Sequence, residues 1–312
     1  MKTYLYDLVI VGGGPIASST AYFLSLNKNK LKTALLKPEP LSKDPYHLST
    51  YLYAGGSIRS YFENREIKKA TSETMEFIRN LNKQKIDLSL IEDYYCFLNR
   101  GVMVPSLNIS SSKLVNYFLT QAQNHKIDIY HKVFLEDIQE DKKNNEVILS
   151  TTIGKFKTCK ALIAIGHSVN KIFPEAGFKF KKRQLFVLDL KLSKEQKSFP
   201  HLILNLNRGI VYIFVKVIDG EHRFVIGQED IFEEDDKFQA TDYFNKLKNM
   251  GLINVLPFLK KAKVVKVLWG FDLEDKTLKI FKKGKILAAC CGSAIRSCVA
   301  IGRKLSKILL KI

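Results

Sequence analysis

The chain has 312 residues, of which 46% are hydrophobic and 26% are charged. This ordinary globular composition excludes collagen-like, coiled-coil and fully disordered proteins, and the length allows one large domain or two interleaved ones. The formal net charge of +19 bears on solubility and partners rather than on fold. The sequence shows no secretory signal, no membrane-spanning run and no Cys-x-x-Cys pair among its five cysteines. We therefore expect a reduced, cytoplasmic protein.

The first predicted strand and helix frame a glycine-rich turn. Leu8–Val11 is a continuously apolar run typical of a buried parallel strand, and residues 16–26 have a helical pattern. The turn between them is a G-x-G-x-x-A motif, made of Gly12, Gly13, Gly14, Pro15, Ile16 and Ala17. Gly12 permits a tight turn, Gly14 lets the backbone approach a pyrophosphate, and Ala17 lets the helix pack closely on the strand. The helix N-terminus would present N–H groups to the phosphates, so the motif predicts a dinucleotide site.

The second predicted strand, Thr33–Leu36, ends in Lys37, at the place where a dinucleotide site usually has an acidic residue that binds the ribose. Three interpretations remain open. Lys37 binds a 2′-phosphate, which would favour NADP. Alternatively, Glu39 binds the ribose while Lys37 points to solvent, or Lys37 is an exposed loop lysine without a ligand.

Further motifs follow this turn in a fixed order. They are Ser49-Thr50, Ala54-Gly55-Gly56-Ser57-Ile58-Arg59, a strand and helix over 102–123, a strand over 127–138, Leu162-Ile163-Ala164-Ile165-Gly166-His167-Ser168, Arg183-Gln184, and Cys291-Gly292-Ser293-Ala294-Ile295-Arg296. This ordered set resembles the FAD-dependent D-amino acid oxidase-like family, which includes the sarcosine and glycine oxidases. The resemblance covers nearly the whole chain.

The resemblance implies an α/β fold in which a Rossmann-like FAD-binding domain is interleaved with a smaller α+β substrate domain built on an antiparallel sheet. The FAD-binding domain would comprise residues 1–80, 111–180 and 280–312, and the substrate domain residues 81–110 and 181–279. Within the substrate domain, Asp219-Gly220 between two apolar runs predicts a hairpin. Residues 238–250 have an amphipathic helical pattern that ends at Gly251.

The resemblance also implies where FAD would bind. Its contacts would be Gly12, Gly14, Pro15 and Ala17 at the pyrophosphate, Lys37 or Glu39 at the ribose, Ser49 and Thr50 at the phosphates, Gly55 and Gly56 at the ring system, Val133 at the adenine, Gly166 in the cofactor channel, and Gly292, Ser293, Ala294, Ile295 and Arg296 over the isoalloxazine. The final helix would point its positive end at the flavin and stabilise the anionic reduced form. Residues 271–280 contain no flavin-linking cysteine, so we expect the FAD to be non-covalent.

In the sarcosine oxidase branch, two basic residues hold the substrate carboxylate, and by motif they correspond to Arg59 and Arg296. The planar fork of arginine suits a carboxylate. The implied reaction is hydride transfer from the carbon that bears the amino group to flavin N5, followed by hydrolysis of the imine. Without the family context, Arg59 would be interpreted as a surface residue beside Glu63, and Arg296 as a solvent-facing residue at a helix start.

Oxidases of that branch have a lysine that assists oxygen just before an Ile-Gly pair. The corresponding position here is Val225, which implies that oxygen is a poor acceptor and that the enzyme is a dehydrogenase. Lys216 is the alternative lysine, because period-two spacing puts it on one strand face with Tyr212 and Phe214. We count Tyr212 among the candidate catalytic residues.

The remaining chemistry-bearing residues are interpreted as structural. The six histidines have no metal-binding spacing, and we expect most of them in surface or loop positions. Cys290-Cys291 belongs to an apolar run, Ile286–Cys291, which predicts a buried strand with inert thiols. The basic, amphipathic final helix either lies on an anionic membrane or, as we prefer, packs on the FAD-binding domain. No recognition motif for nucleic acid accompanies the charge.

Alternatives to amino acid oxidation remain open. The same scaffold would suit a 2-hydroxy acid dehydrogenase that passes electrons to a quinone, or a non-catalytic flavin-fold subunit of a complex, and nicotinamide binding is a fourth option. The partner is expected to be a small-molecule amino acid or hydroxy acid. The sequence leaves the electron acceptor and the oligomeric state unknown.

Overall fold

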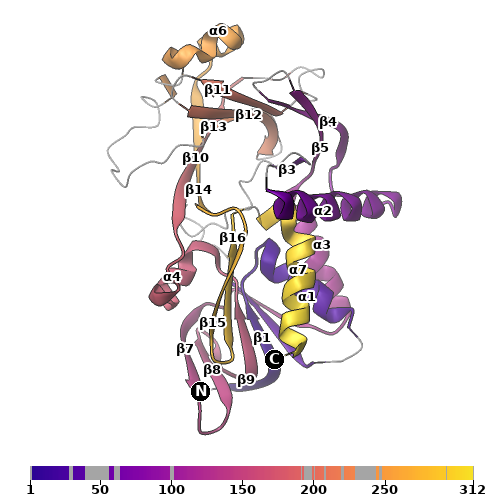
Figure 1. The fold of residues 1–312 in the computed structure, drawn as a ribbon, viewed down its shortest axis with the longest axis vertical. Helices are drawn as coiled ribbons and strands as arrows, with labels where there is room; N and C mark the ends of the chain where they lie inside the picture. The colour runs from indigo at the N-terminus through magenta and orange to yellow at the C-terminus, as the bar shows by residue number, and fades with distance from the viewer. Residues whose placement is uncertain are drawn as a thin grey trace.

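The structure is a computed structural model. It describes residues 2–27, 31–38, 56–59, 64–98, 102–190, 192, 199, 201–206, 209–218, 221–228, 244–245, 248–292 and 294–311. The strands of this part of the chain form two sheets, one at each end of the molecule (Figure 1).

The first sheet has a parallel core in the order β16-β9-β1-β2-β6. These strands are β1 (Thr3–Val11), β2 (Thr33–Lys37), β6 (Asp128–His131), β9 (Gly154–Ile163) and β16 (Ile286–Cys291). Three antiparallel strands extend it, namely β7 (Leu135–Asp141), β8 (Glu146–Thr151) and β15 (Leu278–Lys283). The predicted strands at Thr33–Leu36 and Ile286–Cys291 are confirmed.

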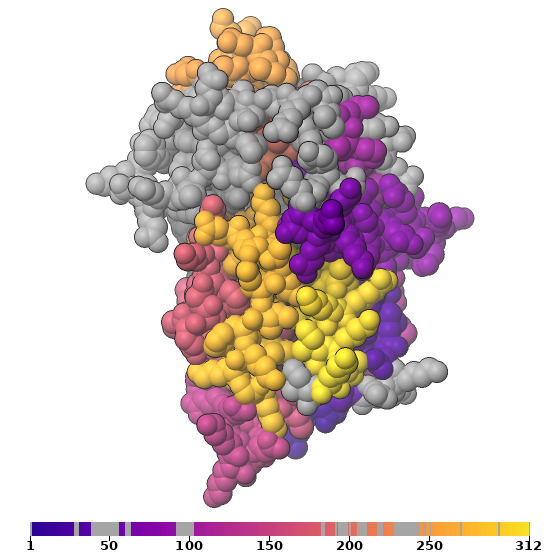
Figure 2. Space-filling view, viewed as in Figure 1, coloured from indigo at the N-terminus to yellow at the C-terminus, as the bar shows by residue number. Residues whose placement is uncertain are grey.

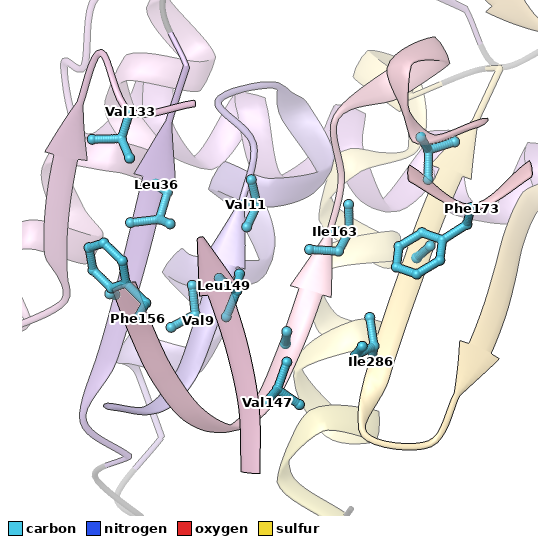
Figure 3. Packing of buried hydrophobic residues seen from close by; sticks show 14 of the residues in the cluster. Val9, Val11, Leu36, Val133, Val147, Leu149, Phe156, Ile163, Phe173 and Ile286 are labelled. Atoms are coloured by element: carbon cyan, nitrogen blue, oxygen red, sulfur yellow. The ribbon is translucent and has the colours of Figure 1, made fainter. Parts of the chain in front are cut away.

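Both faces of this parallel core are buried, which explains its continuous apolar runs. Val9 and Val11 contribute to the cluster drawn in Figure 3, on the face that β8 helps to cover. Leu8 and Ile10 alternate with them and pack against helices on the other face. Those helices are α1 (Pro15–Ser25), α3 (Ser111–Asn124) and α7 (Ala294–Lys311).

Helix α7 packs closely against α1 (Figure 1). A Cβ at Gly302 would lie 2.7 Å from Ser19 Oγ, so α1 and α7 meet where only glycine fits. Ile301, Leu305 and Leu309 of α7 are buried in this contact. The outer surface of α7 is exposed in Figure 2. The apolar side of the basic helix thus packs inside the fold, as the preferred interpretation of its pattern requires.

The second sheet has the order β14-β10-β13-β12-β11-β4-β5-β3. Its strands are β3 (Ser57–Arg59), β4 (Ile91–Leu98), β5 (Val102–Asn108), β10 (Phe180–Leu188), β11 (His201–Leu206), β12 (Gly209–Ile218), β13 (Glu221–Gln228) and β14 (Val264–Leu273). All neighbours pair antiparallel except β4 and β11. The pairing of Ile218 with Glu221 confirms the predicted hairpin between β12 and β13.

The two faces of the second sheet have different neighbours. Ile213, Phe224 and Ile226 lie on an outer face, where they pack with Leu252 and Leu259. These two belong to the short helical segments η6 (Lys248–Leu252), α6 (Ile253–Val255) and η7 (Pro257–Lys261), of which α6 is at the top of Figure 1. The other face carries a cluster of Val187, Phe214, Val225 and Leu268, with Tyr212 packed against it. We call this second face the inner face.

Helix α2 (Arg65–Lys83) begins at Asn64, whose side chain accepts hydrogen bonds from the N–H groups of Glu66 and Ile67. Short helical turns follow β9, namely η3 (Gly166–Ser168), α4 (Val169–Ile172) and η4 (Pro174–Ala176). The helix predicted over 238–250 lies largely outside the described residues. At its predicted end, Gly251 has a φ of 94°. No helix in the described part of the chain has both the length and the apolar character that a membrane span requires.

The predicted α/β fold class is confirmed: one sheet has a parallel core flanked by helices, and the other is mainly antiparallel. The numerical boundaries of the two domains remain a prediction. β3 pairs with β5 in the second sheet, and β15 pairs with β16 in the first.

Candidate active site

The carboxyl ends of the parallel strands bring several predicted cofactor residues to one edge of the first sheet. Val11 pairs with Leu36 on one side and with Ile163 on the other. Gly12 and Gly166 therefore follow the ends of the neighbouring strands β1 and β9, and Lys37 is the last residue of β2. The Cys290 thiol donates to the Gly166 carbonyl over 3.5 Å, so Gly292, two residues further on, belongs to the same edge. Ligands in open α/β sheets bind outside such carboxyl ends.

The turn between β1 and α1 has the geometry that the G-x-G-x-x-A motif predicts. Gly12 has a φ of 140°, and a Cβ at this position would collide with the carbonyl oxygen of Ala164. Ala17 is fully buried where the helix meets the sheet. Helix α1 starts at Pro15 after Gly14, with no side-chain cap and no acidic residue in its first turn. Because the first N–H groups of a helix have no partner within the helix, this terminus suits an anionic group.

Lys37 lies against this turn rather than in an exposed loop. A Cβ at Gly13 would be 2.6 Å from Lys37 Cγ, so the aliphatic stem of the lysine covers the glycine. The interpretation of Lys37 as a merely exposed residue is therefore wrong. Glu39 lies outside the described residues, and the choice between Lys37 and Glu39 at the ribose remains open.

Two other positions at this edge fit a bound dinucleotide. Val133 donates its N–H to the Lys37 carbonyl over 3.4 Å, which places the backbone after β6 beside the end of β2. Gly166 has a φ of 63°, and apart from its two chain neighbours no described residue has a heavy atom within 4 Å of where its Cβ would be. The left-handed backbone favours glycine here and leaves open space beside the edge. The glycine turn, the uncapped α1 terminus and this space fit an elongated anionic cofactor.

The remaining predicted cofactor residues are placed in part. Gly56 has a φ of 66°, and a Cβ there would collide with the Ile109 carbonyl oxygen, so this turn requires glycine. Gly292 and Ala294 are half-buried between the end of β16 and the start of α7, and Ile295 is buried. Four predicted positions, together with Glu39, lie outside the described residues: Ser49, Thr50, Gly55 and Ser293.

The two predicted substrate arginines come together at the junction of the two sheets. Arg296 is in the first turn of α7, and its Nε donates to the carbonyl oxygen of Ser57 over 3.1 Å. Ser57 begins β3, and Arg59 ends it. A residue near the C-terminus is thus joined to a strand 239 positions earlier in the sequence.

His201 lies with these arginines, although the sequence did not single it out. Its side chain is 3% exposed. Burial, followed by the positive charges of Arg59 and Arg296, lowers the pKa of His201 well below the usual value of 6.5. Its ring centroid is 5.2 Å from that of Phe214 and 6.0 Å from that of Tyr212. The expectation that most histidines occupy surface or loop positions is wrong for His201.

Tyr212 lies on the inner face, where it packs with Phe214 and Val225, so the predicted sharing of one strand face by Tyr212 and Phe214 is confirmed. Its catalytic role remains a prediction. Val225 is fully buried and pairs with Phe214 across the strands. Lys216 is on β12, two residues after Phe214, and therefore lies on the same strand face as Tyr212 and Phe214. Burial lowers the pKa of Lys216 to about 7. Of the two adjacent cysteines in β16, Cys290 fits the structural interpretation, because burial raises its pKa to about 12. Cys291 is half-buried.

We compared the chain with known protein families and with curated proteins. No family model matches the chain. A segment of 101 residues, 30% of this chain, is 35% identical to the FAD-dependent oxidoreductase domain-containing protein 1 of Xenopus laevis, and it spans 20% of that protein.

Solved structures match over almost the whole chain. L-proline dehydrogenase from P. horikoshii has a TM-score of 0.77 at 14% identity, with 99% of this chain and 94% of that chain covered. Glycine oxidase from Geobacillus kaustophilus has a TM-score of 0.74 at 16% identity, with 99% and 95% covered. The chain has the fold of these amino acid oxidoreductases. Glycine oxidase from Bacillus cereus ATCC 14579 also matches, with a TM-score of 0.72 at 18% identity over 98% of this chain and 95% of that chain. The predicted likeness to the D-amino acid oxidase-like fold is confirmed.

The inner face of the second sheet combines positive charge, a buried histidine and apolar side chains. Arg59 and Arg296 provide positive charge, and His201 remains uncharged at neutral pH because its pKa is low. Phe214 and Val225 are buried beside them. Such an arrangement attracts a carboxylate and keeps the group next to it away from water.

Proposed function

We propose that the chain is an FAD-dependent oxidoreductase that oxidises the C–N bond of an amino acid or N-methyl amino acid. The observation that carries this proposal is the meeting of Arg59 and Arg296 beside the inner face of the second sheet. The fold supports it, because the structures it resembles are described as a proline dehydrogenase and glycine oxidases.

FAD would be held at the carboxyl edge of the first sheet. Gly12 and the N-terminus of α1 would bind its pyrophosphate, and the start of α7 would approach the ring system. When bound, the flavin accepts the hydride that leaves the substrate carbon. We propose that the attachment is non-covalent, since residues 271–280 contain no cysteine and Cys290 is a buried, protonated thiol.

Arg59 and Arg296 would bind and orient the substrate carboxylate. A charge-assisted hydrogen bond contributes about 1.5–3 kcal/mol, so each arginine is worth roughly ten- to a hundredfold in affinity. The Ser57 carbonyl accepts a hydrogen bond from Arg296 Nε, which fixes the position of the guanidinium group at the start of α7. Fixing the carboxylate also fixes the neighbouring carbon, which is the reacting centre.

The apolar part of the inner face would exclude water from the reacting carbon. Phe214 and Val225 are buried there. We propose that oxygen is a poor acceptor, because the place of the oxygen-assisting lysine is held by Val225. Lys216, whose pKa is lowered to about 7, is the one candidate replacement that we identify on this strand face.

An absorption spectrum of the purified protein, followed by anaerobic additions of substrates, tests this function. The proposal predicts bound flavin whose visible absorption bleaches with an amino acid or an N-methyl amino acid. Bleaching only by 2-hydroxy acids would replace it with the hydroxy acid alternative. Flavin that binds but never bleaches would indicate a non-catalytic subunit, and a protein that takes up no FAD would contradict the proposal.

A further inference from the structure

The imidazole of His201 is buried and has no hydrogen-bond partner in the described part of the chain. Neither ring nitrogen has a hydrogen-bond partner among the residues that the structure describes, and the side chain is 3% exposed. Buried polar side-chain atoms in folded proteins are nearly always hydrogen-bonded, because an unsatisfied one costs about 1–3 kcal/mol. A ring held in this way needs a hydrogen-bonding partner that the described chain does not supply.

The orientation of His201 follows from the strand pattern. Leu202 and Leu204 of β11 pack with the outer-face cluster, so His201 and Ile203 lie on the inner face by period-two alternation. The ring contacts with Tyr212 and Phe214 agree with this placement. His201 therefore points to the side of the sheet where Arg59 and Arg296 meet.

The burial of His201 and the charges around it determine the protonation state of its imidazole. Arg59 from β3 and Arg296 from α7 are the charged groups that act on it, and Tyr212 is the titratable group on the neighbouring strand. With two cations nearby and no access to water, the ring is neutral near pH 7. A neutral imidazole has one nitrogen that accepts a hydrogen bond and one that donates.

We propose that His201 accepts a hydrogen bond from the amino or hydroxyl group on the carbon next to the carboxylate that Arg59 and Arg296 hold. This assignment rests on the proposed function, in that the arginines must bind a carboxylate. A bound carboxylate would offset part of the positive charge beside the ring and so strengthen the ring as an acceptor. His201 would then select carboxylates with an N–H or O–H donor at the adjacent carbon over plain carboxylates.

Three unreactive ligands of nearly equal shape test this selection. They are 2,2-dimethylpropanoate, 2-amino-2-methylpropanoate and 2-hydroxy-2-methylpropanoate, none of which has a hydrogen on the carbon that would be oxidised. Titration calorimetry of the FAD-loaded protein measures their affinities without turnover. We expect one donor-bearing ligand to bind about tenfold more tightly than 2,2-dimethylpropanoate, the size of one net hydrogen bond. Preference for the amino ligand would indicate amino acids, and preference for the hydroxyl ligand would indicate 2-hydroxy acids.

Two substitutions separate hydrogen bonding from packing. His201→Phe keeps a planar ring but has no acceptor, and should reduce the preference to within about twofold while 2,2-dimethylpropanoate binds as before. His201→Asn keeps an acceptor oxygen and should restore part of the preference. His125→Phe, at the exposed C-terminal end of α3, is the matched control and should change nothing.

The outcomes distinguish this inference from the proposed function. Equal binding of all three ligands to the wild-type protein, or an unchanged preference in His201→Phe, would overturn the role of His201 and leave the arginine site intact. Failure of all three carboxylates to bind would contradict the arginine site itself. The flavin absorption spectrum and the melting temperature of each variant show whether it is folded and loaded.

Discussion

His201→Phe should make the protein more stable while it removes the proposed contact with the substrate. In the wild-type protein, two ring nitrogens are buried without described partners, and each group of this kind costs about 1–3 kcal/mol. Phenylalanine fills the same space without polar atoms, beside Phe214 at 5.2 Å between ring centroids. We expect the free energy of unfolding to rise near pH 7 by at least the cost of one such group, about 1–3 kcal/mol.

The gain should be larger in acid. Burial and the charges of Arg59 and Arg296 lower the pKa of folded His201 below 6.5, whereas the unfolded chain has the ordinary value. Below about pH 6.5 the unfolded state therefore binds more protons than the folded state, and wild-type stability falls as the pH decreases. One such group contributes at most about 1.4 kcal/mol per pH unit, and this contribution is absent from His201→Phe.

Equilibrium unfolding in urea at about pH 7.5 and about pH 5.5, with equal excess FAD, measures both effects. His125→Phe is the control, because its side chain is exposed and its loss should alter neither quantity. A His201→Phe protein that is less stable than the wild type, or whose stability depends on pH in the same way, would show that the imidazole has satisfied partners. The reasoning from an unpartnered buried ring would then be refuted.

Three other substitutions test separate parts of the site. Arg59→Ala should weaken carboxylate binding about ten- to a hundredfold in calorimetry without loss of flavin. The control Arg79→Ala, on the exposed side of α2, should have no effect. Loss of flavin from Arg59→Ala would instead assign Arg59 to the cofactor. Gly12→Ala should prevent flavin retention after gel filtration, because its Cβ meets the Ala164 carbonyl, and a yellow variant would contradict the cofactor position. If the ammonium group of Lys216 assists the reaction of reduced flavin with oxygen, flavin reoxidation should slow as the pH rises through about 7, because Lys216 then loses its charge. Lys216→Met should remove this pH dependence in stopped-flow traces.

The first turn of the molecule could be predicted because its determinants are local. The strand, the glycine turn and the helix of the dinucleotide motif are consecutive, and Gly12 has the positive φ that the motif implies. The strand itself begins earlier than predicted, at Thr3 rather than Leu8. Its first four residues alternate between exposed side chains and side chains that are half-buried or buried, so the continuous apolar run covers only the part that is buried on both faces.

The substrate side of the site was predicted less completely because its determinants are distant in the sequence. The ordered motifs implied that Arg59 and Arg296 act together, and the structure joins them through Ser57. His201 opens a strand in which leucines alternate with other residues, and this period-two pattern was the signal for an inner face. Its place beside two arginines depends on the pairing of β11 with β12 and on the packing of α7, which no local pattern contains.

The response of the flavin spectrum to a simple carboxylate tests the central claim most directly. If the arginine pair and the cofactor edge form one site, titration with 2,2-dimethylpropanoate should shift the visible flavin absorption to saturation at the affinity found by calorimetry. Arg296→Met should weaken both responses together. A carboxylate that binds by calorimetry but leaves the flavin spectrum unchanged would separate the two and contradict the account.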